Sequence, residues 1–353
     1  QYDKLTDIAY FGLYLNEDGT FMTRTTMLGE DDEETEDIDE SEIEYEIEEP
    51  GYSFWHNNEI LEDVIEEAKD HGVRVSLTVI AHDDESNDKF LQCRECWDVF
   101  LDNLVTELEV HDISSVNLNF EYYEYSDGDK SDTFAEFTSF VNNSLSALYD
   151  DSYVVVSAFA DSIIRPRISS NVHELGKSAD GIFIMGYDFR RAVSDSSGPN
   201  SPLKNKGEFY DYDLTTMLED YLTRVPPNKL ILGVPYYGYN WVVEKDEPYA
   251  MRLEGDDEIG YSESQTYDSI MDTILEVEPE ILWDENAEVP YFSYIASDTE
   301  SIRMVYYDNA QSLKAKYDLI KKNNLAGVGI WALGYDGGYT ELWDLLYDEF
   351  VKE

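Results

Sequence analysis

Seven short apolar runs, spaced along the whole chain, constrain the fold of this sequence more than any other feature. Each is rich in β-branched and aromatic residues, and its apolar character is nearly continuous rather than alternating. Strands that are covered on both faces of a parallel sheet have this character. The runs therefore predict seven buried parallel strands, at Asp7–Leu15, Val73–Ile80, Ser115–Phe120, Tyr153–Phe159, Gly181–Tyr187, Lys229–Tyr237 and Gly327–Leu333.

Amphipathic stretches with helical periodicity lie between most of these runs. Repeated βα units of this size predict an α/β fold of the TIM (β/α)8-barrel type, with a doubly wound sheet as the alternative. Only seven strands are visible, because the first begins at Asp7 and no apolar run precedes it. The predicted helices are Asn58–His71, Phe90–Leu108, Asp132–Tyr149, Leu214–Arg224, Gln311–Asn323 and Thr340–Val351.

Two segments interrupt this alternation. Residues 30–49 are strongly acidic and are expected to form a solvated loop, with cation binding as the alternative. Residues 242–305 separate the last two strands and contain short β-like pieces. We expect them to form a small inserted α+β subdomain, so that the barrel itself comprises residues 1–241 and 306–353.

The charge of the chain excludes several classes of function. Its 353 residues include 78 Asp and Glu but only 24 Lys and Arg, a formal net charge of −54. This field would repel the phosphates of nucleic acids and the headgroups of anionic membranes. No run of apolar residues is long enough to span a bilayer. We expect a halophilic protein that unfolds when desalted, because concentrated salt screens such self-repulsion; a mesophilic acidic protein is the alternative.

The two cysteines, Cys93 and Cys96, form one C-x-x-C within the predicted helix Phe90–Leu108. A zinc site would need further ligands, and the five histidines show no ligand spacing. We expect either two helical thiols or a local disulfide, and no metal or cofactor.

The strongest site signal is the segment Ser115–Tyr122, where Asn117, Asn119 and Glu121 alternate with apolar residues. This period of two places the three polar side chains on one face of a strand. Catalytic groups of barrel enzymes lie at the carboxyl ends of strands. Other strand ends carry Met185, Tyr187, Asp188, Tyr236, Tyr237 and Trp331.

These strand ends resemble glycoside hydrolase family 18, the chitinase family. The family signature D-x-x-D-x-D-x-E aligns with residues 114–121, and its M-x-Y-D motif is matched by Met185, Tyr187 and Asp188. The strand at Asp7 then corresponds to the family's second strand, and we expect that the sequence has been trimmed before it. Further resemblance lies in Lys229–Trp241, in Gly327–Gly338, and in Pro290–Leu319, which is similar to the inserted subdomain of spore-cortex-lytic N-acetylglucosaminidases.

The resemblance implies retaining hydrolysis of β-1,4-linked N-acetylglucosamine glycans, either chitin and its oligomers or peptidoglycan. In this family the 2-acetamido group of the substrate is the nucleophile, so the enzyme supplies one acid. Glu121 stands at the position of that acid/base. We expect partial burial among Tyr122, Tyr187 and Trp331 to raise the pKa of Glu121.

The resemblance also assigns roles around Glu121. Asn119 stands where the family has an aspartate that orients the acetamide group, and Tyr187 would bind the acetamide oxygen. The aromatic residues of the cleft could instead fill the barrel core. The expected substrate-binding residues are Asn117, Met185, Asp188, Trp331, Tyr10, Phe11, Tyr236 and Tyr237.

Asn119 is the main departure from the family signature. An asparagine cannot take up charge or a proton, both of which the family's aspartate can do. A sugar-binding barrel with weakened or no catalysis is therefore the alternative function, and a structural surface protein is a third. In each case we expect a monomer, located outside the cell or on its surface, whose partner is a saccharide containing N-acetylglucosamine.

Overall fold

The computed structural model describes residues 1–28, 44–122, 129–207 and 209–352. Within them, seven parallel strands lie where the apolar runs predicted them, which confirms the α/β class. They belong to two compact units, one formed mainly by Tyr2–Ser157 with Pro166–Asp180 and the other by Ala158–Arg165 with Gly181–Glu353. The strands are β1 (Asp7–Tyr14), β4 (Arg74–Ala81), β5 (Ser115–Phe120), β6 (Tyr153–Phe159), β7 (Gly181–Met185), β8 (Leu230–Pro235) and β14 (Gly327–Trp331).

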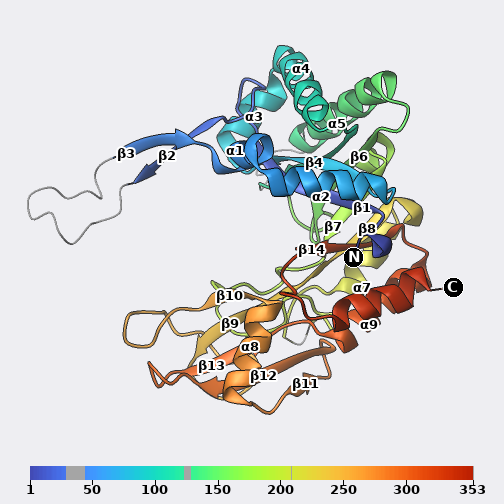
Figure 1. The fold of residues 1–353 in the computed structure, drawn as a ribbon. Coiled ribbons are helices and arrows are strands. Elements are labelled where there is room, and N and C mark those ends of the chain that lie inside the picture. Colours follow the sequence, from blue (N-terminus) through green and yellow to red (C-terminus); the bar gives the residue numbers. More distant parts are fainter. Residues whose placement is uncertain (29–43, 123–128, 208, 353) are drawn as a thin grey trace, which may run out of the picture. The chain divides into compact units, whose positions relative to one another are not determined.

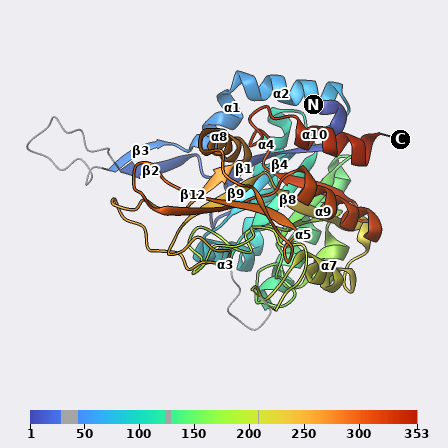
Figure 2. The same cartoon turned by 90° about the horizontal axis from the view of Figure 1, so that it is seen from below.

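In the first unit, the strands follow the order β1-β4-β5-β6. Leu77, Val79, Val116 and Leu118 are fully buried on the face that the helices cover. Helices α1 and α2 pack beside β1 and β4 (Figures 1 and 2). The helices of this unit are α1 (Pro50–Asn57), α2 (Glu59–Asp70), α3 (Asp84–Gln92), α4 (Arg94–Val110), α5 (Asp129–Leu148) and α6 (Val172–Ser178), and a short 3₁₀ turn spans Tyr2–Lys4.

An antiparallel hairpin, β2 (Arg24–Leu28) with β3 (Glu44–Glu48), also belongs to this unit. Most of the predicted acidic loop 30–49 lies outside the described residues. Its final part is described and consists of β3 and the residue after it, Glu49. The Glu49 carboxylate accepts a hydrogen bond from the backbone N–H of Tyr52 at 2.6 Å and so caps α1.

The second unit combines the parallel strands β7, β8 and β14 with a five-stranded antiparallel sheet, in the order β10-β9-β13-β12-β11. This sheet includes residues on both sides of the predicted 242–305 segment, because β9 begins at Tyr237 and β13 ends at Tyr306. Helix α8 packs on β9 and β10 (Figure 1). The remaining elements are β9 (Tyr237–Val243), β10 (Glu263–Thr266), β11 (Leu282–Asp284), β12 (Val289–Ile295), β13 (Ile302–Tyr306), α7 (Leu214–Leu222), α8 (Tyr267–Val277), α9 (Ala310–Asn323), α10 (Glu341–Leu346), a 3₁₀ turn at Pro227–Lys229 and a π turn at Tyr347–Val351.

The single predicted helix Phe90–Leu108 is wrong, because α3 ends at Gln92, α4 begins at Arg94, and Cys93 lies between them. The backbone of Cys93 is extended, with φ −92° and ψ 91°, and its Sγ accepts a hydrogen bond from the N–H of Cys96 at 3.2 Å. The two cysteines form a disulfide, which decides between the two alternatives left open by the sequence. Helices α1, α6 and α8 were not predicted; α1 and α6 are only 8 and 7 residues long, too short to show a clear helical period.

Candidate active site

A row of polar side chains crosses the inner face of the first unit. The register pairs Thr78 of β4 with Asn117 of β5. Asn117 donates through Nδ2 to Thr78 Oγ1 at 3.4 Å, and its Oδ1 accepts from Ser157 Oγ at 3.2 Å. The apolar neighbours Val116 and Leu118 are fully buried on the opposite face. The predicted alternation along this strand is therefore present, and Asn117 has its amide held by the two neighbouring strands.

Glu121 lies directly after β5, beside the carboxyl end of β4. Its backbone N–H donates to the carbonyl of Ala81 at 2.9 Å, which continues the strand pairing. Asn119 Nδ2 donates to Glu121 Oε1 at 2.8 Å. His82 Nε2 lies 3.1 Å from Asn119 Nδ2 and 3.4 Å from Glu121 Oε1. Asn119 is buried, whereas 30% of the Glu121 side chain and 39% of the His82 side chain are exposed. Glu121 is thus open to solvent in this unit and oriented by two polar neighbours.

The pKa of Glu121 lies below its ordinary value. Burial by itself would raise this pKa, but hydrogen bonds from His82 and Asn119 favour the carboxylate and outweigh burial, with the positive charges of His82 and Arg167 adding to them. The expectation of a raised pKa is therefore wrong. Tyr122 does not surround the carboxyl group as expected, because its side chain points the other way and donates to Asp88 Oδ1 at 3.3 Å.

Two aromatic side chains of β1 lie on the same face as this cluster. Phe11 is paired with Thr78, and Tyr14 with Ile80. Both are more than a third exposed, and the Tyr14 ring meets the His82 ring edge-on with centroids 6.3 Å apart. Phe11 therefore lies beside the polar row, as does Tyr14, which was not predicted.

Tyr10, by contrast, faces helix α1. Its hydroxyl donates to the carbonyl of Gly51 at 2.8 Å, and its ring packs against Trp55 with centroids 4.9 Å apart. Burial, with the nearby charge of Glu49, raises the pKa of Tyr10 to about 12. Tyr10 therefore packs within the protein, which was the alternative to the prediction that it lines the sugar cleft.

In the second unit, Asp188 follows β7 and is held by two tyrosines. Tyr237 and Tyr239 both donate to Asp188 Oδ1, the latter at 2.7 Å. The backbone N–H of Asp188 donates to Asn200 Oδ1 at 2.7 Å, and the residue has a left-handed φ of 63°. Burial and the charge of Asp188 raise the pKa of Tyr237 well above its ordinary value. These contacts fix the orientation of Asp188, and Tyr239 was not predicted.

The remaining predicted residues of this unit divide between two environments. Tyr187 and Trp331 are half-buried and pack against the aromatic cluster that contains Tyr237. Tyr236 is fully buried and Met185 nearly so, with 9% of its surface exposed. Tyr236 therefore takes the alternative role in the packed core and cannot line a sugar cleft.

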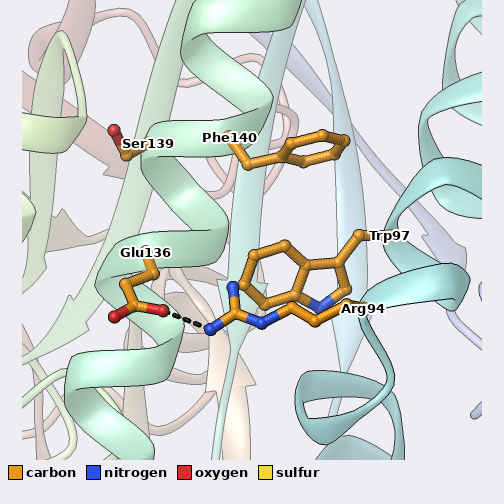
Figure 3. Close-up of a pocket in the computed structure, with 5 residues that line it drawn as sticks. All are labelled: Arg94, Trp97, Glu136, Ser139 and Phe140. Carbon is orange, nitrogen blue, oxygen red and sulfur yellow. Dashed lines mark hydrogen bonds and ion pairs between the residues drawn. The ribbon is translucent and has the colours of Figure 1, made fainter.

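A shallow pocket between α4 and α5 shares no residue with this site (Figure 3). The Arg94 guanidinium lies over the Trp97 ring, 3.8 Å from its centroid, and forms an ion pair with Glu136. This pocket contains none of the residues that surround Glu121 or Asp188, so it is not the candidate active site. Among the residues that the structure describes, no group of three or more His, Cys, Asp and Glu could hold a metal ion, and no helix is long and apolar enough to cross a membrane.

Comparison with known proteins decides the family. The family model for glycosyl hydrolases family 18 matches residues 13–336, which is most of the chain. The chain belongs to glycosyl hydrolases family 18. The family 18 relatives include the cortical fragment-lytic enzyme of Bacillus subtilis (strain 168), 31% identical over 176 residues that make up 50% of this chain and 36% of the relative. The human di-N-acetylchitobiase is 26% identical over 200 residues, 52% of this chain and 50% of the relative.

Solved structures of low sequence identity share the fold. The spore cortex-lytic enzyme SleL of Bacillus megaterium QM B1551 matches with a TM-score of 0.72 and 18% identity, over 99% of this chain and 68% of that chain. The Group IV chitinase of Ostrinia furnacalis matches with a TM-score of 0.76 and 17% identity, over 99% and 93%. The TIM-type barrel is thereby confirmed over the doubly wound alternative. The chain spans half or less of the length of the two curated relatives named above.

Proposed function

We propose that this family 18 protein hydrolyses β-1,4-linked N-acetylglucosamine glycans with retention of configuration, and that chitin oligomers are its preferred substrates. Three findings support the proposal. The chain belongs to a family of glycosyl hydrolases, its relatives include di-N-acetylchitobiases and a cortical fragment-lytic enzyme, and Glu121 stands at the family's acid position. The single observation that carries it is the Asn119–Glu121 hydrogen bond at the end of β5, with Glu121 exposed to solvent.

Glu121 would act first as an acid and then as a base. It protonates the glycosidic oxygen while the substrate's own acetamide oxygen attacks the anomeric carbon, which forms an oxazolinium ion. Glu121 then removes a proton from the water that opens this ion, and the double displacement retains the configuration. Because the Nδ2 of Asn119 is engaged by Glu121 and His82, its Oδ1 remains to accept the acetamide N–H.

The other residues would bind and orient the sugar. Tyr187 would donate its hydroxyl to the acetamide oxygen, and the Trp331 ring would stack against the C–H face of the sugar. Asp188, fixed by Tyr237 and Tyr239, would accept a hydrogen bond from a sugar hydroxyl. Phe11 would offer a further apolar surface.

A second candidate function is sugar binding with weakened catalysis. Two observations favour it: Asn119 replaces the family's aspartate, and the pKa of Glu121 is lowered, which reduces the fraction of protonated acid near neutral pH. Such a protein would bind chitooligosaccharides and turn them over slowly or not at all.

One experiment separates the two functions. The wild type and Glu121→Gln are incubated in multimolar salt with a fluorogenic chitobioside, and binding of chitotetraose is measured by calorimetry. A hydrolase releases fluorophore in the wild type and loses at least about 10²-fold of that rate in Glu121→Gln, while it still binds the tetraose. Binding by both variants with no release by either would support the lectin, and the absence of both binding and release would refute both proposals.

We also propose that the protein works outside the cell or at its surface. The Cys93–Cys96 disulfide supports this location, because such bonds persist in oxidising compartments. Insoluble or high-molecular-weight glycans are also accessible only there. Detection of the protein in the culture medium or on the cell surface would test the proposal, and its confinement to the cytosol would refute it.

A further inference from the structure

Nε2 of His82 has two polar neighbours that require opposite protonation states. Asn119 Nδ2, which lies 3.1 Å away, can only donate, so this contact is a hydrogen bond only when His82 Nε2 carries no proton. Glu121 Oε1, at 3.4 Å, accepts when it is ionised, so this contact strengthens when Nε2 carries a proton. The protonation state of one nitrogen atom therefore selects between the two contacts.

Asn119 itself cannot hold a proton, unlike the aspartate expected at this position. It lies between the other two side chains and donates to Glu121 Oε1 at 2.8 Å. His82 is the titratable group that the fold places against this amide, at the carboxyl end of the neighbouring strand β4. In the sequence, the place of His82 directly after β4 is the only sign of this contact, because 39 residues separate His82 from Glu121 along the chain.

We propose that His82 and Glu121 share one proton, so that His82 performs the proton-holding role that an aspartate at position 119 would have. The proposal rests on the proposed function of Glu121 as the acid/base. In the first step the single proton of the pair moves from His82 Nε2 to Glu121 Oε1, and Glu121 donates it to the glycosidic oxygen, which leaves His82 neutral and Glu121 ionised. When Glu121 later takes a proton from the attacking water, that proton returns to the pair, so no proton is gained or lost over the cycle. His82 is a positioning and proton-storing residue in this scheme and does not contact the sugar.

The surroundings of His82 permit such a shared proton. The pair is partly exposed, so a proton can exchange with solvent. The Tyr14 ring is in edge-on contact with the imidazole. Asp83, the next residue, has its carboxylate engaged by the backbone N–H of Ser86 at 2.8 Å. The titratable or charged groups that act on the pair include Tyr14, whose ring meets His82, and Arg167, whose charge acts on Glu121.

A shared proton predicts a particular pH dependence. A pair that interacts strongly loses its protons in two separated steps, and the pair holds a single proton between them. The population of the acid form of Glu121 is constant over that interval, so kcat/KM is expected to be flat there and to fall only above the second step. In His82→Gln the plateau disappears, and the alkaline limb begins about one to two pH units lower, near the range of an ordinary carboxyl group.

The control and the rescue use residues of the same chain. His173→Gln, on the exposed surface of α6, is expected to keep the wild-type profile. Asn119→Asp, combined with His82→Gln, is expected to restore the plateau, because the new carboxyl group can again share a proton with Glu121. A merely structural role of His82 would lower activity at every pH and would not be rescued by Asn119→Asp.

A second measurement does not depend on activity. The ring nitrogens of His82 are followed by NMR as the pH is changed, in the wild type and in Glu121→Gln. Loss of the carboxylate is expected to change the pH response of the His82 ring nitrogens, while that of His173 stays unchanged. Equal midpoints of His82 in the two proteins would overturn the proposal, whether or not the enzyme is active. A shifted midpoint in a protein with no hydrolytic activity would instead refute only the proposed function.

Discussion

The substitution Asn119→Asp tests the electrostatics of the site most directly. In the wild type, Asn119 Nδ2 donates to Glu121 Oε1 at 2.8 Å and stabilises the carboxylate, which lowers the pKa of Glu121. A hydrogen bond to a charged group contributes about 1.5–3 kcal/mol, and one pKa unit corresponds to about 1.4 kcal/mol. Loss of this one bond should therefore remove a stabilisation of the carboxylate of that order and raise the pKa of Glu121.

An aspartate also adds a negative charge at about the same separation. Neighbouring carboxylates of this kind titrate about 3 units apart, so we expect the last proton of the site to be held about 2–3 units more tightly than in the wild type. The last proton is held more tightly whether it resides on Glu121 or on His82, because the added negative charge favours the protonated form of either group.

The assay is the pH profile of kcat/KM on a fluorogenic chitobioside, measured in multimolar salt. The alkaline limb of Asn119→Asp should lie about 2 pH units above that of the wild type, and turnover near neutral pH should rise. Asn117→Asp is the matched control, because Asn117 is on the same strand but contacts Thr78 and Ser157. The alkaline limb of the Asn117→Asp profile should move by less than about half a pH unit relative to the wild type. An unchanged or lowered limb in Asn119→Asp, or a fall in turnover, would show that the site is adapted to the amide and would refute this reasoning.

Three further predictions concern the remainder of the molecule. The protein has a net charge of −54, so its melting temperature should rise as KCl is increased from about 0.1 M to several molar. The reason is that the Debye length falls from about 10 Å to about 3 Å or less, which screens the repulsion between acidic side chains. A constant melting temperature would refute the halophilic hypothesis. Lys316 and Asp308 form an ion pair that is fully buried, so Asp308→Ala should lower the free energy of unfolding by about 3–5 kcal/mol in denaturant titrations, whereas Asp308→Ala with Lys316→Met should recover much of that loss. Tyr239→Phe removes one of two hydroxyls that hold Asp188, so it should raise KM more than it lowers kcat, and an equal effect on both would contradict a role in substrate binding.

Much of the fold was accessible from local pattern. Seven parallel strands lie at the predicted runs because each strand buries a short run of apolar side chains, and such a run is visible without knowledge of the partners. The prediction of one continuous helix over Phe90–Leu108 failed because a short-range contact overrides the apolar periodicity. Cys93 ends one helix and caps the next through a hydrogen bond from the N–H of Cys96, and the apolar periodicity on either side gives no sign of this break.

For the candidate site as well, local pattern predicted some features and could not predict others. The alternation along β5 predicted that Asn117, Asn119 and Glu121 share a face, because the side-chain period of a strand is fixed by its backbone. The pKa of Glu121 could not be predicted correctly, since it depends on which side chains of other elements lie within a few ångströms of the carboxylate. His82 is one of these, and its place after β4 was the only available signal.

Local and additive properties such as periodicity, strand alternation and composition were enough to predict the α/β class, the place of Glu121 at the end of a strand and the net charge. Only the tertiary structure decided that Tyr10 and Tyr236 belong to packed regions, that two tyrosines hold Asp188, and that His82 adjoins Glu121. The physical reason is that burial, pKa and hydrogen bonding depend on distances between side chains far apart in the chain, and those distances are set by strand register and helix packing.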